Sequence, residues 1–250
     1  MSGEPTIRAG AASDVGLVRA ANEDNFVLTG TVFAVADGMG GHAAGDVASG
    51  LAVAGLARLG AEQGTVRPDD VRRHVMRLNA DILAAAARNP EQAGMGTTVT
   101  GICLVDFAGS AHWVVFNVGD SRVYRLADKE FAQLTVDHSE VTELVAAGEL
   151  SPAEAATDPR RNVVTRALGA PVAPEPDLLV FPPTVGDRFL LCSDGLTGEL
   201  DDGTIADILA AEPDPRAAAE RLVRAAVAAG GRDNVTAVVV DHVADAPGVS

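Results

Sequence analysis

The chain has 250 residues, of which 35 are aspartate or glutamate and 19 are lysine or arginine, giving a formal net charge of −16. This length is enough for one domain with a sizeable core, and 47% hydrophobic residues are too many for a disordered protein. The negative balance argues against a nucleic-acid partner, because the protein would repel a phosphate polymer. No apolar run is long enough to span a membrane, and the N-terminus lacks a signal-peptide core.

The two cysteines, Cys103 and Cys192, lie inside apolar runs. This placement predicts buried, reduced thiols and therefore a cytoplasmic protein. No feature signals assembly, so a monomer is the default expectation. The residues before about position 6 and the tail over 244–250 are expected to be loose, and one domain is expected over 6–243.

The first clear element is a hairpin. Asn25–Thr29 and Thr31–Ala36 are short β-prone segments, and Gly30 between them can adopt the backbone angles of a tight turn. A turn centred there pairs residues whose numbers add up to 61, so Asp24 faces Asp37. Two carboxylates held this close repel each other, and one takes up a proton unless a cation neutralises the pair.

Periodicity predicts two helices after the hairpin, four strands with no helix between them, a strand, two more helices and a last strand. In chain order these are His42–Leu59 and Pro68–Ala87; Thr97–Val105, Ala111–Val118, Ser121–Leu126 and Phe131–Leu134; Asp187–Ser193; Gly203–Ala211 and Pro215–Ala229; and Val235–Val240.

The stretch from Val136 to Pro176 contains no convincing strand. It is predicted to hold a short helix near Glu140–Ala147 and a second helix opened by a capping box, Ser151 with Glu154. So long a departure from the core pattern predicts a functional flap, over about 137–176.

Strands occur in consecutive runs and helices in consecutive pairs, which favours an α+β fold with antiparallel sheets. The runs Val32–Ala36 and Val235–Val240 are apolar at every position, so both faces of these strands are expected to be covered. The simplest closure is a central sandwich of two sheets flanked by pairs of helices.

Aspartates follow or precede several apolar strands directly. Any one of them is most simply explained as a turn residue, because Asp-Gly and Gly-Asp are common turn dipeptides. As a set they are harder to dismiss, since oxygen ligands that converge from strand ends are what magnesium or manganese requires. They are Asp37, Asp120, Asp194 and Asp233.

Six motifs in order resemble the metal-dependent protein phosphatases of the 2C type, in their compact bacterial form. They cover nearly the whole chain, roughly residues 7 to 243, and are highly specific together. The motifs are Leu17-Val18-Arg19-Ala20-Ala21-Asn22-Glu23-Asp24, Val35-Ala36-Asp37-Gly38-Met39-Gly40-Gly41-His42, Gly94-Met95-Gly96-Thr97-Thr98, Gly119-Asp120-Ser121-Arg122, Leu191-Cys192-Ser193-Asp194-Gly195 and Asp233-Asn234-Val235-Thr236.

The resemblance implies hydrolysis of phosphoserine and phosphothreonine in proteins at a binuclear Mn²⁺ or Mg²⁺ site, with a metal-activated water as the nucleophile. Serine/threonine protein kinases are the substrates that the family suggests. The implied roles are bridging of two metals by Asp37, a carbonyl ligand from Gly38, ligation by Asp194 and Asp233, second-shell contacts from Glu23 and Asp24, a possible third ion at Asp120 with Asp194, and phosphate binding by Arg19.

The proton donor to the leaving group is less clear. Some family members have a histidine where this chain has Met39, and His42 is nearby but is expected to be structural. A metal-bound water is the preferred donor. Gly94, Gly96, Thr97 and Thr98 are expected to support the site structurally.

Three arginines form a basic cluster within the predicted flap: Arg160, Arg161 and Arg166. They are expected either to dock acidic phosphopeptides or simply to form a solvated basic face.

Two other functions stay open at this point. A non-catalytic regulator that binds phosphoproteins on the same fold predicts a broken metal set, whereas all the aspartates are present. An acidic calcium-binding module predicts a closely spaced loop of Asp and Asn residues, which the chain lacks.

Overall fold

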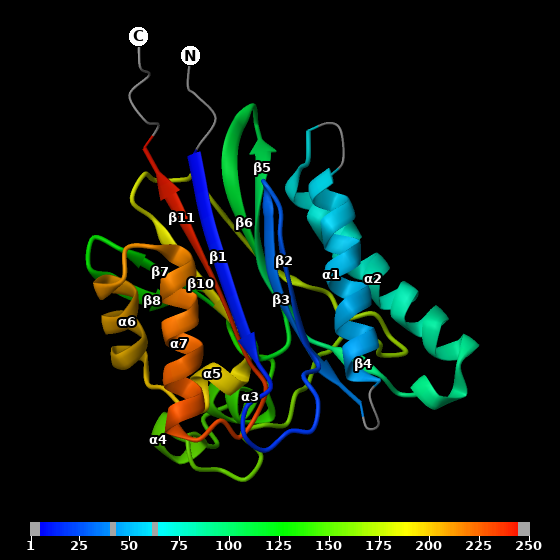
Figure 1. Cartoon of the computed structure of the whole chain (residues 1–250). Coiled ribbons are helices and arrows are strands. Elements are labelled where there is room, and N and C mark those ends of the chain that lie inside the picture. Colours follow the sequence, from blue (N-terminus) through cyan, green and yellow to red (C-terminus); the bar gives the residue numbers. More distant parts are fainter. Residues whose placement is uncertain (1–5, 41–43, 62–64, 245–250) are drawn as a thin grey trace.

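The computed structural model describes residues 6–40, 44–61 and 65–244. Two sheets with antiparallel pairing lie face to face (Figure 1). The first sheet has the order β1 (Thr6–Asp14), β11 (Val235–Val243), β10 (Arg188–Cys192), β7 (Arg122–Ala127) and β8 (Glu130–Gln133). The second has the order β2 (Asp24–Leu28), β3 (Val32–Met39), β5 (Val99–Phe107), β6 (Ser110–Val118) and β9 (Asp177–Phe181), and the short β4 (Gly96–Thr97) pairs with β3.

Helices cover both outer faces of the sandwich, as Figure 1 shows. The second sheet is covered by α1 (Gly45–Ala61) and α2 (Pro68–Arg88), and the first by α6 (Asp202–Ala211) and α7 (Pro215–Ala229). Three short helices lie together at the end of the sandwich away from the chain termini: α3 (Glu140–Ala146), α4 (Pro152–Ala155) and α5 (Asp194–Thr197). A single 3₁₀ turn spans Pro90–Gln92. The predicted α+β sandwich is therefore confirmed.

The apolar run in β3 shows why both of its faces are covered. Val32, Ala34 and Ala36 pack in the core beneath α1 and α2. Phe33 and Val35 point the other way, into the core between the sheets. Successive side chains of a strand alternate between faces, so a strand with a core on each side must be apolar throughout.

The sequence patterns do not predict three of the observed elements. The hairpin is not the first element, because β1 precedes it; β9 and α5 were also not predicted. The β1 sequence is rich in glycine and alanine, and its pairing with β11 rather than its own propensity makes it a strand. Gly10 is required there, since a Cβ would lie 2.3 Å from the Arg216 backbone of α7.

Other boundaries agree closely with prediction. The first helix begins at Gly45, while residues 41–43, including the predicted start at His42, lie outside the described residues. The predicted tail over 244–250 lies outside them from residue 245 onward. Both cysteines are buried and free, as expected. Within the described part of the chain, no helix is long and apolar enough to cross a membrane.

The segment 137–176 contains no named strand and two short helices, and the capping box of Ser151 and Glu154 is present. Isolated bridges join it to the rest of the chain at Thr97 with Leu168 and close it internally at Ser139 with Val164. Its status as a separate flap remains a prediction.

Candidate functional site

Asp24 and Asp37 face each other in the β2–β3 ladder, in the register predicted from the turn. Asp24 is 6% exposed, and its Oδ2 accepts a 2.7 Å hydrogen bond from the Ser193 hydroxyl. Its other oxygen, Oδ1, is buried with no hydrogen-bond partner. Burial raises the pKa of Asp24 to about 7 and raises that of Asp37 well above its ordinary value, with the Asp24 charge adding to the effect on Asp37.

The backbone of Asp37 is held by hydrogen bonds to two threonines, Thr97 and Thr98. Its N–H donates to the Thr98 hydroxyl, and its carbonyl accepts from the Thr97 hydroxyl and the Thr98 N–H. Thr98 in turn bonds to the Ser121 hydroxyl at 2.8 Å, next to Asp120. The expected supporting role of the threonines is confirmed: they connect two candidate acids.

Three further aspartates lie beside strand ends of both sheets: Asp120 follows β6 of the second sheet, whereas Asp194 follows β10 and Asp233 precedes β11 of the first. Asp194 is the first residue of α5, and its charge adds to the rise in the pKa of Asp37. Burial, followed by repulsion from Asp233, raises the pKa of Asp194. Asp120 follows β6, is 7% exposed, and has its pKa raised to about 7 by burial and then by Asp194. The five acids therefore form one electrostatically coupled group.

Arg19 is the cation beside this group. Its Nη2 donates to Asp233 Oδ2 at 2.6 Å, and the guanidinium remains half exposed. The loop that carries it is held by Asn234, which accepts from the Glu23 N–H and donates to the Val15 and Ala21 carbonyls. Asn234 belongs to the last of the six motifs, but the motif alone does not predict this anchoring role; its position directly after Asp233 is the one signal in the sequence.

Gly38 and Glu23 lie where the chain packs too tightly for extra atoms. A Cβ on Gly38 would be 2.2 Å from the Gly45 carbonyl oxygen and 2.5 Å from that of Glu23. The Glu23 carboxylate lies against Gly45, the first residue of α1, where the positive end of the helix dipole favours an anion.

These features fit a divalent cation. Buried carboxylates that repel each other and a buried oxygen without a partner are both relieved by a bound cation. Among the described residues, no three metal-ligating side chains converge into a complete ligand set. The individual ligand assignments therefore stay predictions.

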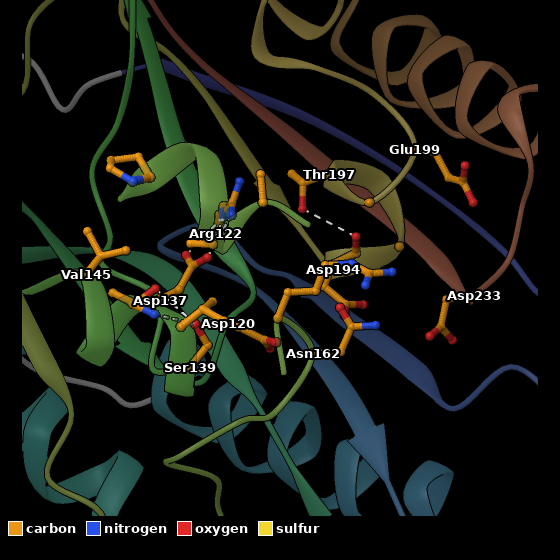
Figure 2. Close-up of a pocket in the computed structure, with 18 of the residues that line it drawn as sticks. Asp120, Arg122, Asp137, Ser139, Val145, Asn162, Asp194, Thr197, Glu199 and Asp233 are labelled. Atoms are coloured by element: carbon orange, nitrogen blue, oxygen red, sulfur yellow. Dashed lines mark hydrogen bonds and ion pairs between the residues drawn. The ribbon is translucent and has the colours of Figure 1, made fainter. Parts of the chain in front are cut away.

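A cavity of about 560 Å³ opens beside the acids. Asp120, Asp194 and Asp233 line one part of it, and residues of α3 and α4 such as Val145 and Ala155 line another. Figure 2 shows Val145 and Asp137 on the opposite side of the pocket from Asp233 and Glu199. The predicted flap segment thus faces the candidate site.

The basic cluster does not act as one patch. Arg160 pairs with Asp158 and Glu140, and Arg166 pairs with Asp177. Arg161 alone of the three lines the cavity.

Residues 19–228 match the family described as "Protein phosphatase 2C". The chain belongs to that family. The serine/threonine protein phosphatase PstP of Mycobacterium tuberculosis is 43% identical over 238 residues, which cover 95% of this chain and 45% of PstP. The serine/threonine phosphatase stp of Listeria welshimeri is 37% identical over 244 residues, covering 92% and 94% of the two chains.

Solved structures of the protein phosphatase 2C family agree with the fold. The crystal structure of M. tuberculosis PstP/Ppp has a TM-score of 0.88 and 43% identity, covering 95% of this chain and 99% of that one. A structure of the PstP catalytic domain in complex with two manganese ions has a TM-score of 0.85 and 42% identity, with the same coverage. The resemblance inferred from the motifs is confirmed. The chain spans less than half the length of full PstP but nearly all of the Listeria relative.

Proposed function

We propose that this protein is a metal-dependent serine/threonine protein phosphatase that hydrolyses phosphoserine and phosphothreonine in other proteins. One observation carries the proposal: five electrostatically coupled aspartates come together from separate segments, three of them line a cavity, and a half-exposed arginine is bonded to one of these three. A cation site and a neighbouring guanidinium together suit the binding of a phosphorylated side chain, because both attract the negative phosphoryl oxygens. Curated relatives over nearly the full chain are named as phosphatases of this kind.

The residues have distinct parts in the proposed site. Asp37, Asp194 and Asp233, with the Gly38 carbonyl, would hold two Mn²⁺ or Mg²⁺ ions, and Glu23 and Asp24 would orient waters around them. Asp120 with Asp194 would hold a third. Bound ions supply positive charge for the phosphoryl oxygens and activate the attacking water.

Arg19 binds the substrate phosphate in this proposal. Its contact with Asp233 shows that the guanidinium reaches the acids, and its planar fork can donate two hydrogen bonds to two phosphate oxygens. The chain itself supplies no covalent nucleophile in this scheme.

The proton for the leaving oxygen is assigned to a water held at the site, as predicted from the sequence. Met39 carries no proton for this purpose, and His42 lies outside the described residues. His138 is buried, with its Nδ1 accepting from the Gly119 N–H and its Nε2 beside Asp177, so it is already engaged.

The test is phosphate release from a phosphothreonine peptide with Mn²⁺ or with chelator. Asp37→Asn should lower kcat by about a thousandfold or more, because it removes a charge from the centre of the site. Asp81→Asn, on the outer helix α2, is the matched control and should behave like wild type. Activity of wild type that survives chelation, or of Asp37→Asn that equals wild type, would refute the proposal. An inert wild type would favour the non-catalytic regulator.

Four finer expectations remain proposals. Kinases as substrates and the use of Mn²⁺ or Mg²⁺ rest on the family, a cytoplasmic location rests on the two buried cysteines, and a monomer is the default expectation.

A further inference from the structure

Glu199 makes a contact that neither the motifs nor the family assignment explains. It follows α5, and its side chain is 4% exposed. Oε1 accepts from the Arg232 main-chain N–H at 3.0 Å and from Nε at 2.8 Å, and Oε2 accepts from Nη2 at 2.9 Å. These bonds lower the pKa of Glu199, so the carboxylate stays charged near neutral pH. One buried carboxylate therefore binds both the backbone and the side chain of Arg232.

The contact joins the two segments that carry Asp194 and Asp233. Glu199 lies five residues after Asp194, and its own N–H bonds back to the Leu196 carbonyl of α5. Arg232 directly precedes Asp233. In Figure 2, Glu199 and Asp233 lie on the same side of the pocket.

The segment before Asp233 needs such an anchor. It contains Gly230 and Gly231, and Gly231 has a φ of +51°, in the left-handed region that favours glycine. A Cβ on Gly230 would lie 2.6 Å from Glu199 Oε2, so the glycine makes room for this carboxylate. A second close approach lies nearby, where a Cβ on Gly195 would be 1.9 Å from the Asn234 carbonyl oxygen.

The two segments carry carboxylates of like charge, Asp194 and Asp233, which repel each other when both are ionised. Pairing of β10 with β11 and the hydrogen bonds between Ser193 and Thr236 join the two segments on the strand side, and the Glu199–Arg232 contact adds a second tie beyond the strand ends. The second tie limits the separation of the two like charges before a cation binds. An anchor that lies outside the ligand set therefore improves cation affinity by removing a reorganisation step.

We propose that Glu199 is a positioning residue which, through Arg232, holds Asp194 and Asp233 together as a preformed cation-binding pair. This inference rests on the proposed function, because that proposal makes the two aspartates metal ligands. Glu199 lies at the wall of the cavity but is not one of the proposed metal ligands, and it acts on them through Arg232.

The test is Mn²⁺ binding to chelator-treated protein, measured by titration calorimetry, together with the Mn²⁺ concentration that gives half-maximal phosphatase activity. Glu199→Ala should weaken Mn²⁺ binding about tenfold or more and shift the activity midpoint by a similar factor. Glu199→Gln should fall between Glu199→Ala and wild type, because its amide oxygen can still accept from the Arg232 N–H. Saturating Mn²⁺ should restore most of kcat in both.

Glu220→Gln is the matched control, since this glutamate pairs with arginines on the outer surface of α7. It should leave Mn²⁺ affinity unchanged. Arg232→Ala breaks the same contact at the Arg232 side chain, which is 68% exposed. This variant provides the test if substitution of the buried Glu199 prevents folding. It should also weaken Mn²⁺ binding.

A merely structural role has a different signature. Variants that melt at lower temperature in chelator but bind Mn²⁺ with wild-type affinity would overturn the inference while leaving the proposed function intact. A wild-type protein that neither binds Mn²⁺ nor releases phosphate would instead refute the proposed function.

Discussion

Arg161 differs from its two neighbours in the basic cluster by having its side chain at the cavity while theirs are bound to carboxylates. No ion pair involves Arg161 within the described residues. Of the three arginines, Arg161 is therefore the one available to an acidic phosphopeptide. The predicted docking role is limited to this residue.

Arg161→Ala should reduce kcat/KM for an acidic phosphopeptide about fivefold more than for a small aryl phosphate, the loss expected for one partly exposed ionic contact. Arg160→Ala should show no such difference, because Asp158 and Glu140 already occupy that guanidinium. Steady-state kinetics of both variants with both substrates measures this difference in kcat/KM. Equal effects of the two variants would leave the solvated basic face as the better explanation.

At the scale of elements, a helix on the outer face of the sandwich holds the end of the predicted flap. Asn79 of α2 is 2% exposed; its Oδ1 accepts from the Gly169 N–H at 2.7 Å, and its Nδ2 donates to the Ala170 carbonyl at 3.0 Å. Among the residues that the structure describes, no strand pairs with residues 169 and 170, so one side chain replaces the strand pairing that would otherwise satisfy these backbone groups.

Asn79→Ala should therefore lower the free energy of unfolding by about 2–3 kcal/mol, because it leaves two backbone groups without partners. Arg77→Ala, at an exposed position of the same helix, should change it by less than about 0.5 kcal/mol. Urea denaturation compares them. Similar effects from the two substitutions would show that the side chain does not anchor this segment.

For the whole molecule, the buried acids make stability depend on both pH and metal. Burial raises the pKa of Asp24 and of Asp120 from 3.8 to about 7, so the folded chain binds more protons than the unfolded chain between these values. Stability from this source is fully present below about pH 4 and is lost as the pH rises through about 7.

In chelator, raising the pH from 5 to 7.5 should accordingly lower the melting temperature. Added Mn²⁺ should raise the melting temperature most at pH 7.5, where the acids are charged and repel each other without it. Differential scanning calorimetry across this range measures both effects. A melting temperature in chelator that increases with pH, or one that Mn²⁺ leaves unchanged, would contradict the coupled-acid description.

Sequence reasoning succeeded where local patterns determine structure. Turn geometry at Gly30 placed Asp24 opposite Asp37, and fully apolar strands predicted the two-sided core. Ordered motifs identified the family, because each one keeps its chemistry within a few consecutive residues.

Only the tertiary structure decided the rest. β1 becomes a strand through a partner more than 200 residues away, and the fold brings Asp194 close enough to Asp37 for the Asp194 charge to raise the pKa of Asp37. The pairing of Arg160 with Glu140, of Arg166 with Asp177 and of Glu199 with Arg232 also comes from the fold, since a charge in a sequence shows no preference among many possible counter-ions. Short-range geometry is encoded locally, whereas ion pairing and burial depend on which distant segments the sheets bring together.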